Sequence, residues 1–508
     1  MIKVETTNLP ELTPNLTQWI YNGLDTMLTS ELTEKLTEEL NPTTERTYKF
    51  SLALQAPIME MTVRGIKVDR TQLKRTLKQV EQAIAKLEDC FTRLCLEGIG
   101  LDRAPNWRSP SQLKYFFFQV LKAKEVKKMN TAGGFSASTD RAALERIGKE
   151  SYYSRIPSNI ILALRDLDKQ RQFLSTKLDS DGRLRSNWNI AGTKTGRLFS
   201  SVSDFRTGTN NQNIDRALRS VFIPDKGMKF ANLDLEQADA RGVGAVCWNI
   251  GKEPGNVPVD YRVIEHCGAY LDACEAGDLH TQVCKMVWRE LDWPNEPKAD
   301  RALADQPFYR EFSYRDCAKR VGHGCNYMGL ANIAKATGIE KSKLADFRDR
   351  YFSAFPTIPF WHDWVRYTLK TTGQITTLMG RRRCFFGRLN DENVLREAVA
   401  YEPQSITADT VNTGMLHLWR AELGVHILAQ VHDSILLQYP EVDEDWILPE
   451  IIDLMTVAAP LKHGRSFTIP VEAKVGWNWG DASENNPRGL RKYERSEPSN
   501  KLESSPTG

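Results

Sequence analysis

The stretch Arg315-Asp-Cys-Ala-Lys-Arg-Val-Gly-His-Gly-Cys-Asn-Tyr327 says more about the fold than any other part of the chain. Within it, Arg315, Lys319, His323 and Tyr327 stand four residues apart, and we call these four residues the ladder. On a helix of about 3.6 residues per turn, a step of four residues rotates the side chain by only about 40°. The ladder would therefore line one slowly turning helix face. Its cationic end suits a triphosphate and its aromatic end suits a base, although a solvated basic face with a core tyrosine is the structural alternative.

Two aspartates flank the ladder in the sequence, each next to a predicted strand. Residues 229–234 resemble a short strand that ends in Asp234, and residues 427–439 form two apolar runs around His432 and Asp433, which predicts a hairpin with the acid at its tip. Taken alone, either aspartate is more typical of a turn or a cap. Magnesium-dependent phosphoryl transfer, however, needs two carboxylates that hold a pair of metal ions about 4 Å apart. Asp234 and Asp433 suit this chemistry if their strands are neighbours.

The bulk composition is that of an ordinary folded protein with several subdomains. The chain has 508 residues, 26% charged and 41% hydrophobic, and its net charge is only +3. A nucleic-acid surface would therefore be a local cleft, balanced by acidic surface elsewhere. The nine cysteines include no CxxC pair, which argues against a disulfide framework or a zinc site and favours a reducing compartment. No signal peptide is recognisable and no apolar run reaches the roughly 18 residues of a membrane span, so the sequence predicts a cytoplasmic protein without membrane contact.

Periodicity and turn residues give a coarse map of the remaining chain. A charged helical stretch is predicted from about Thr71 to Leu96, and a mostly helical region fills about 240–372. Residues 374–386 then suggest a hairpin with a basic turn. Residues after Gly480 are polar and rich in Pro and Ser, which predicts a disordered tail.

Several spaced motifs together resemble the DNA polymerase I-like family, the family A DNA polymerases. Asp234–Arg241, the ladder and Gln430–Asp433 match the palm and fingers motifs of that family, in the same order. Further matches are Thr195-Gly-Arg-Leu198 with Gln212-Asn-Ile214, Asp278-Leu-His280, the spacing of Arg396, Gln404 and Asp409, and Val471-Glu472 followed by Gly476 and Asn478-Trp479. The resemblance covers about residues 45–480. It implies an α+β right-hand polymerase with an antiparallel palm sheet, helical fingers and a helical thumb.

The resemblance also implies a role for each matched residue near the reacting groups. Asp234, Asp433 and the carbonyl of Leu235 would bind two Mg²⁺ ions, for which Mn²⁺ can substitute. Asp234, Asp433 and Lys319 would be the catalytic residues, with Lys319 able to protonate the pyrophosphate. The dNTP would be bound by Arg315, Lys319, His323, Tyr327, Asp239, His280 and Gln237.

A second group of matched residues would hold primer-template DNA through phosphate and minor-groove contacts. Such contacts check the shape of the duplex and not its sequence, as a general polymerase requires. An ordinary structural hydrogen bond is an open alternative for each residue of this group except Arg241. Its members are Arg197, Gln212, Asn213, Arg241, Arg396, Gln404 and His432.

Four positions depart from the family pattern, and one of them is Met328, which separates Tyr327 from Gly329 where the family usually has Tyr and Gly adjacent. Asp239 stands where the family usually has the glutamate that blocks a ribose 2′-hydroxyl, so we expect weaker exclusion of ribonucleotides. His323 stands where the family commonly has phenylalanine or tyrosine, which leaves acceptance of dideoxynucleotides open. Ser434 follows Asp433 where the family often has glutamate, so the two aspartates would have to suffice without an accessory carboxylate.

The N-terminal segment suggests a partner. Tyr21-x3-Asp25 resembles the last motif of the family's 3′–5′ exonuclease domain, but the earlier acidic motifs have no counterpart in this sequence. We therefore expect a structural remnant and no proofreading by this chain alone. A separate exonuclease subunit or a processivity factor could bind the chain.

The resemblance predicts a template-directed DNA polymerase of replication or repair, in a bacterial cell or a phage-infected host. A single-subunit RNA polymerase is the rival enzyme, but it usually has glycine at the position of Asp239. A catalytically dead clamp is the other rival, but both aspartates and Lys319 are present. The implied parts are an exonuclease-like remnant at 1–48, palm at 49–70, thumb at 71–145, palm at 146–241, fingers at 242–378, palm at 379–480 and a disordered tail at 481–508.

Overall fold

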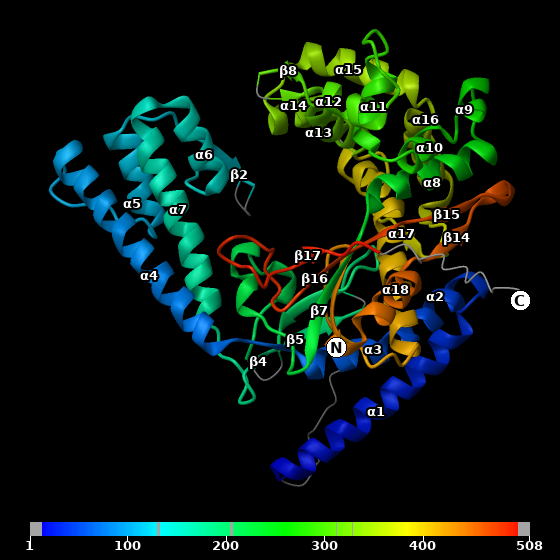
Figure 1. Cartoon of the computed structure of the whole chain (residues 1–508), viewed down its shortest axis with the longest axis horizontal. Helices are drawn as coiled ribbons and strands as arrows, with labels where there is room; N and C mark the ends of the chain where they lie inside the picture. The colour runs from blue at the N-terminus through cyan, green and yellow to red at the C-terminus, as the bar shows by residue number, and fades with distance from the viewer. Residues whose placement is uncertain are drawn as a thin grey trace, which may run out of the picture. The chain divides into compact units, whose positions relative to one another are not determined.

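The computed structural model describes residues 13–129, 133–190, 192–203, 207–310, 312–327 and 329–495 (Figure 1). The chain forms two compact units, and each is built from segments distant in sequence. Unit 1 comprises Met1–Gln55, Asp239–Ile406 and Leu461–Arg465, and unit 2 comprises Ala56–Ala238, Thr407–Pro460 and Ser466–Gly508.

Unit 2 contains a five-stranded sheet with antiparallel neighbours, in the order β12-β13-β7-β16-β17. Figure 1 labels three of these strands, β7, β16 and β17. The strands are β7 (Met228–Leu235), β12 (His426–Val431), β13 (Ser434–Pro440), β16 (Val471–Gly476) and β17 (Arg491–Lys492). Most residues of β12 and β13 are buried, as their near-continuous apolar sequences require. The predicted strand at 229–234 and the predicted hairpin at 427–439 are both confirmed, and they are neighbours in the sheet.

The C-terminal strand β17 corrects one prediction. Arg491 and Lys492 pair with Val475 and Lys474, and the backbone N–H of Leu490 donates to the Gly480 carbonyl at 2.7 Å. A Cβ on Gly489 would lie 2.5 Å from that same carbonyl oxygen, so only glycine allows this approach. The disordered tail predicted from residue 481 is therefore wrong up to residue 495, because a polar composition does not reveal such backbone anchors. Residues 496–508 lie outside the described part.

Helices α4, α6 and α7 pack together in unit 2 (Figure 1). α4 begins after Asp69, whose carboxylate accepts the N–H groups of Thr71 and Gln72, and the helical stretch predicted from Thr71 is confirmed. The helices of unit 2 are α3 (Gln55–Arg64), α4 (Arg70–Arg93), α5 (Pro110–Lys114), α6 (Arg141–Glu150), α7 (Tyr152–Leu174) and α18 (Glu444–Met455), with the π-helical turns η1 (Leu94–Gly98) and η2 (Tyr115–Val120). Its short two-stranded sheets pair β1 (Ile66–Lys67) with β4 (Arg183–Leu184), β2 (Lys127–Met129) with β3 (Phe135–Ala137), β5 (Ser186–Asn189) with β6 (Phe199–Val202), and β14 (Ala458–Pro460) with β15 (Ser466–Thr468).

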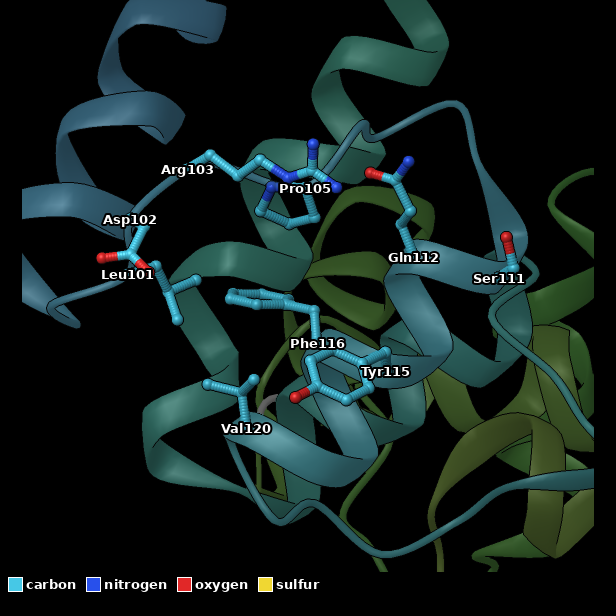
Figure 2. Close-up of a pocket in the computed structure, with 9 residues that line it drawn as sticks. All are labelled: Leu101, Asp102, Arg103, Pro105, Ser111, Gln112, Tyr115, Phe116 and Val120. Atoms are coloured by element: carbon cyan, nitrogen blue, oxygen red, sulfur yellow. The ribbon is translucent and has the colours of Figure 1, made fainter.

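A pocket of about 490 Å³ lies where the chain passes from η1 into α5 and η2 (Figure 2). Leu101, Phe116 and Val120 gather on one side of it, while Arg103 and Gln112 extend on the other. Its lining contains none of the residues that the sequence analysis assigns to metal, nucleotide or DNA.

Unit 1 is mainly helical, as predicted for residues 240–372. Its core includes Tyr351 and Trp361, which are fully buried. The helices are α1 (Pro14–Glu38), α2 (Pro42–Ala53), α8 (Ala238–Lys252), α9 (Tyr261–Glu265), α10 (Ala269–Glu275), α11 (Leu279–Val287), α12 (Pro297–Ala304), α13 (Tyr314–Tyr327), α14 (Leu330–Thr337), α15 (Lys341–Ala354), α16 (Thr357–Thr372) and the first part of α17 (Glu392–Arg420). The predicted hairpin at 374–386 is confirmed as β10 (Gln374–Thr376) paired with β11 (Arg382–Cys384), and β8 (Pro307–Tyr309) pairs with β9 (Phe312–Ser313).

Helix α1 buries none of its residues. Leucine or isoleucine recurs every four residues along it, at Leu16, Ile20, Leu24, Leu28, Leu32 and Leu36, and all six side chains are exposed. No helix in the described ranges is both long and apolar enough to cross a membrane.

Glu402 on α17 is a buried carboxyl group whose titration should affect stability. Its Oε1 accepts the backbone N–H of Leu378 at 3.1 Å, but burial raises its pKa from 4.5 to about 7. The folded state therefore binds more protons than the unfolded state between these pH values, and the free energy of unfolding falls as pH rises through that window. We expect Glu402→Gln to raise the stability of unit 1 at pH 8 by about 1–3 kcal/mol and to add almost nothing at pH 4.5. Thermal unfolding at both pH values measures this, and an equal gain at both would contradict the assignment.

Candidate functional site

Asp234 and Asp433 come together because β7 pairs with β13. Ser434, the first residue of β13, stands directly opposite Asp234. The backbone N–H of Leu235 donates to the Asp433 carbonyl at 3.2 Å. His432, at the hairpin tip, has a φ of 59°, the left-handed conformation that lets the chain reverse in so few residues. The predicted metal ligands Asp234 and Asp433 thus lie at the same end of the neighbouring strands β7 and β13.

The electrostatics of this carboxylate pair favour a bound cation. The pKa of Asp234 is raised to about 6, first by desolvation and then by the negative charge of Asp433. A divalent cation would relieve this repulsion, and hard ions such as Mg²⁺ prefer oxygen ligands. Within the described residues, no group of three His, Cys, Asp or Glu side chains forms a ready-made metal site. The residues present therefore suit an ion that keeps several waters or substrate oxygens among its ligands.

Glu472 is a third acidic residue at this site that the sequence analysis did not foresee. It stands directly opposite Asp234 on β16, and directly opposite residues of an antiparallel pair project from the same face. Its charge contributes to the raised pKa of Asp234, whereas Lys474 lowers that pKa. The negative charge around Asp234 is therefore not limited to the two aspartates. Only the pairing of β16 with β7 reveals this, because the two strands are more than 200 residues apart in sequence.

The ladder lies on one face of α13, as its spacing predicts. Lys319 and His323 are exposed and Arg315 and Tyr327 are half-buried. The opposite face is buried through Cys317, Ala318, Val321 and Cys325. The helix start is stabilised by Ser313 and Asp316, since the Asp316 N–H donates to the Ser313 hydroxyl at 3.0 Å and the Asp316 carboxylate accepts the Ser313 N–H at 3.3 Å.

Arg315 already has a carboxylate partner. Its guanidinium donates two hydrogen bonds of 2.8 Å to Asp278, which also accepts the N–H of Thr281 at the start of α11. Desolvation opposes ionisation of Asp278, but the hydrogen bonds from Arg315 and Thr281 hold its pKa well below the usual range. The positive charge that Arg315 can offer a triphosphate is thus partly neutralised.

His280 and Lys319 differ in charge although both are predicted triphosphate contacts. Burial, followed by the charge of Arg315, lowers the pKa of His280 to about 4, so its imidazole is neutral at pH 7 and can donate only one hydrogen bond. Lys319 is exposed and makes no ion pair or hydrogen bond with any described residue. Lys319 is therefore the ladder cation that is available to an incoming anion.

Asp239, at the start of α8, interacts with two rungs of the ladder. The hydroxyl of Tyr327 donates to Asp239 Oδ2 at 3.0 Å, and Nδ1 of His323 lies 3.5 Å from the same oxygen. Desolvation and the neighbouring carboxylate raise the pKa of Tyr327 well above its ordinary value, so the phenol stays protonated. Gln237, between β7 and α8, is half-buried with a left-handed φ of 55°.

The predicted DNA contacts separate into buried and accessible residues. Arg241 is almost fully buried and donates to the Cys274 carbonyl at 2.9 Å, and Gln212 binds the backbone of Leu198 and Ser200. These bonds give Arg241 a structural role and favour the structural alternative for Gln212. Asn213 and His432 are exposed, and Arg197, Arg396 and Gln404 are half-buried, so these five remain accessible to a ligand.

Comparison with known proteins shows the family. The model of DNA polymerase family A matches residues 70–247 and 308–481. This chain belongs to DNA polymerase family A, and the resemblance inferred from its motifs is confirmed.

Relatives and a solved structure agree with this membership. The thermostable DNA polymerase I of Thermus filiformis is 26% identical over 448 residues, 85% of this chain and 48% of that protein. DNA polymerase I of Caldicellulosiruptor bescii is 26% identical over 436 residues, 83% of this chain and 46% of that protein. The chain thus spans about half the length of these relatives. The POL domain of Pol1 from M. smegmatis, solved in complex with DNA primer-template and dNTP, matches with a TM-score of 0.66 and 22% identity over 84% of this chain and 70% of that chain. The predicted α+β right-hand polymerase fold is confirmed.

Proposed function

We propose that this chain is a template-directed DNA polymerase that adds dNTPs to a primer 3′-hydroxyl, in DNA replication or repair. The observation that carries the proposal is the pairing of β7 with β13, which brings Asp234 beside Asp433. Membership of DNA polymerase family A supports the proposal. In such a polymerase, the ladder would bind the nucleotide and the two aspartates would bind the metal ions of the same nucleotide-transfer reaction. The subdomain bounds given in the sequence analysis are part of this proposal.

The residues present fit two Mg²⁺ ions, for which Mn²⁺ can substitute, held by Asp234, Asp433 and the Leu235 carbonyl. When bound, such ions lower the pKa of an attacking hydroxyl and stabilise a leaving pyrophosphate. The chain itself supplies anion binding and a proton. Lys319 attracts the triphosphate, and its ammonium can donate a proton to the leaving pyrophosphate oxygen. Arg315 positions the phosphates within its ion pair with Asp278, and neutral His280 adds a hydrogen bond.

Primer extension tests the proposal directly. With a primer-template and Mg²⁺, we expect extension with dNTPs and much slower extension with NTPs. Faster extension with NTPs would instead indicate an RNA polymerase. Binding of the duplex without extension by either substrate would indicate a clamp.

We expect this chain to discriminate against ribonucleotides less strongly than its Asp239→Glu variant does. Asp239→Glu adds one methylene where the carboxylate would block a 2′-hydroxyl, and one methylene in a binding site typically changes specificity about tenfold or more. We expect Asp239→Glu to raise the ratio of kcat/KM for dATP over ATP about tenfold. Single-nucleotide insertion measures this ratio, and an equal or higher ratio in the parent chain would contradict the prediction.

A separate exonuclease subunit is the partner that we propose for the N-terminal segment, with a processivity factor as the alternative. Support comes from α1, whose large apolar side chains remain exposed. Without nucleotides, we expect this chain with Mg²⁺ to leave a 5′-labelled primer intact. If the chain does shorten the primer, and if Asp25→Ala abolishes this shortening, Tyr21 and Asp25 form a working exonuclease site instead. The site of action that we propose is the cytoplasm of a bacterial cell or a phage-infected host.

A further inference from the structure

Two lysines face each other across the last two strands of the five-stranded sheet, and we call them the lysine pair. Lys474 on β16 pairs directly with Lys492 on β17. Directly opposite residues of an antiparallel pair project from the same face, with Cβ atoms about 5 Å apart, and like charges in this arrangement repel each other and destabilise the sheet. An anion held between the two ammonium groups would remove this repulsion.

Two acidic residues near the lysine pair balance its charge only in part. Nζ of Lys474 lies 4.0 Å from Asp481, and Nζ of Lys492 lies 3.9 Å from Glu472. Both distances are too long for a hydrogen bond, and an ammonium group has three donors to offer. The side chains of Lys474 and Lys492 are 41% and 61% exposed, so these ion pairs contribute little and an anion from solvent can reach both ammonium groups.

The lysine pair lies on the face of the sheet that carries the proposed metal site. Lys474 is two residues beyond Glu472 on β16, and Glu472 stands directly opposite Asp234. Residues two apart in a strand point to the same face, so the lysine pair shares a face with Asp234. This face is accessible, because Glu472 and Lys474 are half-buried and Lys492 is exposed, whereas Ala473 points to the other face and is buried. The charge of Lys474 acts on the site, since it lowers the pKa of Asp234.

The spacing between the lysine pair and Asp234 fits a DNA strand. A step of two residues along a strand is about 6.6 Å, and neighbouring strands are about 4.8 Å apart. The lysine pair is one such step from the level of Asp234, on the two strands that follow β7 in the sheet. A DNA strand carries one phosphate for about every 3.4 Å of helix axis. If the primer 3′-hydroxyl lies at Asp234, as the proposed function requires, the nearest primer phosphates are within reach of the lysine pair.

We propose that the lysine pair binds a phosphodiester group of the primer strand close to its 3′ end and so holds the primer beside Asp234. This inference rests on the proposed polymerase function. Lys492 on β17 lies outside the ranges 70–247 and 308–481 that the family model matches, so the contact is an addition of this chain. Because phosphate contacts carry no sequence information, the lysine pair would hold a primer of any sequence.

The salt dependence of DNA binding tests the proposal. Lys474→Gln combined with Lys492→Gln removes both charges and keeps side chains of similar length. By fluorescence anisotropy with a labelled primer-template and no nucleotide, we expect this double variant to bind about tenfold more weakly, with a slope of log affinity against log KCl concentration that is less steep by about 1 to 2. Lys474→Arg combined with Lys492→Arg should keep the parent values. So should Lys226→Gln, an exposed lysine before the opposite end of β7.

Neutral linkages in the DNA locate the contact. A methylphosphonate replaces one charged phosphodiester of the primer at a time, beginning at the 3′ end. One of these linkages should weaken binding to the parent chain about fivefold but weaken binding to the double variant less than about twofold, because the charge and its partner are coupled. An unchanged salt slope in the double variant would overturn the proposal, as would coupling to linkages of the template strand alone.

Two further measurements separate this contact from other roles of the lysine pair. Pre-steady-state incorporation at saturating DNA should give an unchanged apparent dissociation constant for dNTP, and a weaker constant with unchanged DNA binding would assign the lysine pair to the triphosphate instead. The melting temperature of the double variant should equal or exceed that of the parent, because the repulsion is removed. A lower melting temperature with the parent salt slope would show a purely structural pair. A parent chain that binds primer-template but extends no primer would overturn the proposed function instead, so the two failures are distinguishable.

Discussion

Replacing Asp433 with alanine is expected to slow primer extension at least about 1,000-fold, the largest effect that we predict for this chain. Metal ions at a phosphoryl-transfer site contribute several kcal/mol, and each 1.36 kcal/mol is a factor of about ten in rate. Asp433 lies at the tip of the β12–β13 hairpin, next to the residue that stands opposite Asp234. Its loss removes one of the two carboxylates that the proposed ions share. Single-turnover incorporation with saturating dNTP measures the chemical step, and extension at the parent rate would show that Asp433 binds no essential metal.

Glu472→Gln is the matched control for this prediction. Glu472 stands directly opposite Asp234 and contributes negative charge there, but it is not assigned as a ligand. We expect a loss of less than about tenfold, because removing a nearby charge weakens cation binding without removing a ligand. Binding of Mn²⁺ followed by calorimetry gives a second readout that is independent of turnover. Asp433→Ala should abolish this binding, and Glu472→Gln should only weaken it.

Replacing Lys319 with arginine is expected to slow incorporation about 100-fold while dNTP binding changes much less. Arginine keeps the positive charge at an exposed position of α13, but its guanidinium does not release a proton at neutral pH. General acid catalysis typically contributes about 10²- to 10⁴-fold, so loss of the proton donor should appear in kcat. Pre-steady-state incorporation at several dNTP concentrations separates the maximal rate from the apparent binding constant.

Lys335→Arg on α14 is the control for Lys319→Arg. It makes the same substitution at another exposed helix position of unit 1, outside the ladder. We expect no measurable change in the maximal rate. If Lys319→Arg also kept the parent rate, Lys319 would serve as an anion-binding charge and another group would protonate the pyrophosphate. If Lys319→Arg weakened only the binding of dNTP, we would likewise conclude that Lys319 is not the proton donor.

The elements that the sequence predicted correctly depend on local spacing. The shared face of the ladder follows from the rotation per residue of a helix, and the structure has all four residues on one side of α13. The strand at 229–234 and the hairpin around Asp433 follow from short apolar runs with a polar end. These patterns are complete within a few residues, so no knowledge of distant partners is needed.

The errors and omissions concern contacts between segments far apart in the chain. The tail after Gly480 has a polar composition, yet its strand β17 pairs with β16. Glu472 was not assigned to the site, yet it stands opposite Asp234 on β16. Neither outcome has a local signal, because backbone pairing and burial depend on which segments fold beside them.

By itself, the sequence therefore determined the family, the ladder face and the pair of aspartates, since periodicity and motif order are properties of the chain alone. Only the tertiary structure decided the partner of each charge. It joined Arg315 to Asp278, left Lys319 exposed, set Glu472 opposite Asp234 and held Asp239 between Tyr327 and His323. The physical reason is that electrostatic interactions act through space, over a few ångströms, between side chains that can be many residues apart in sequence.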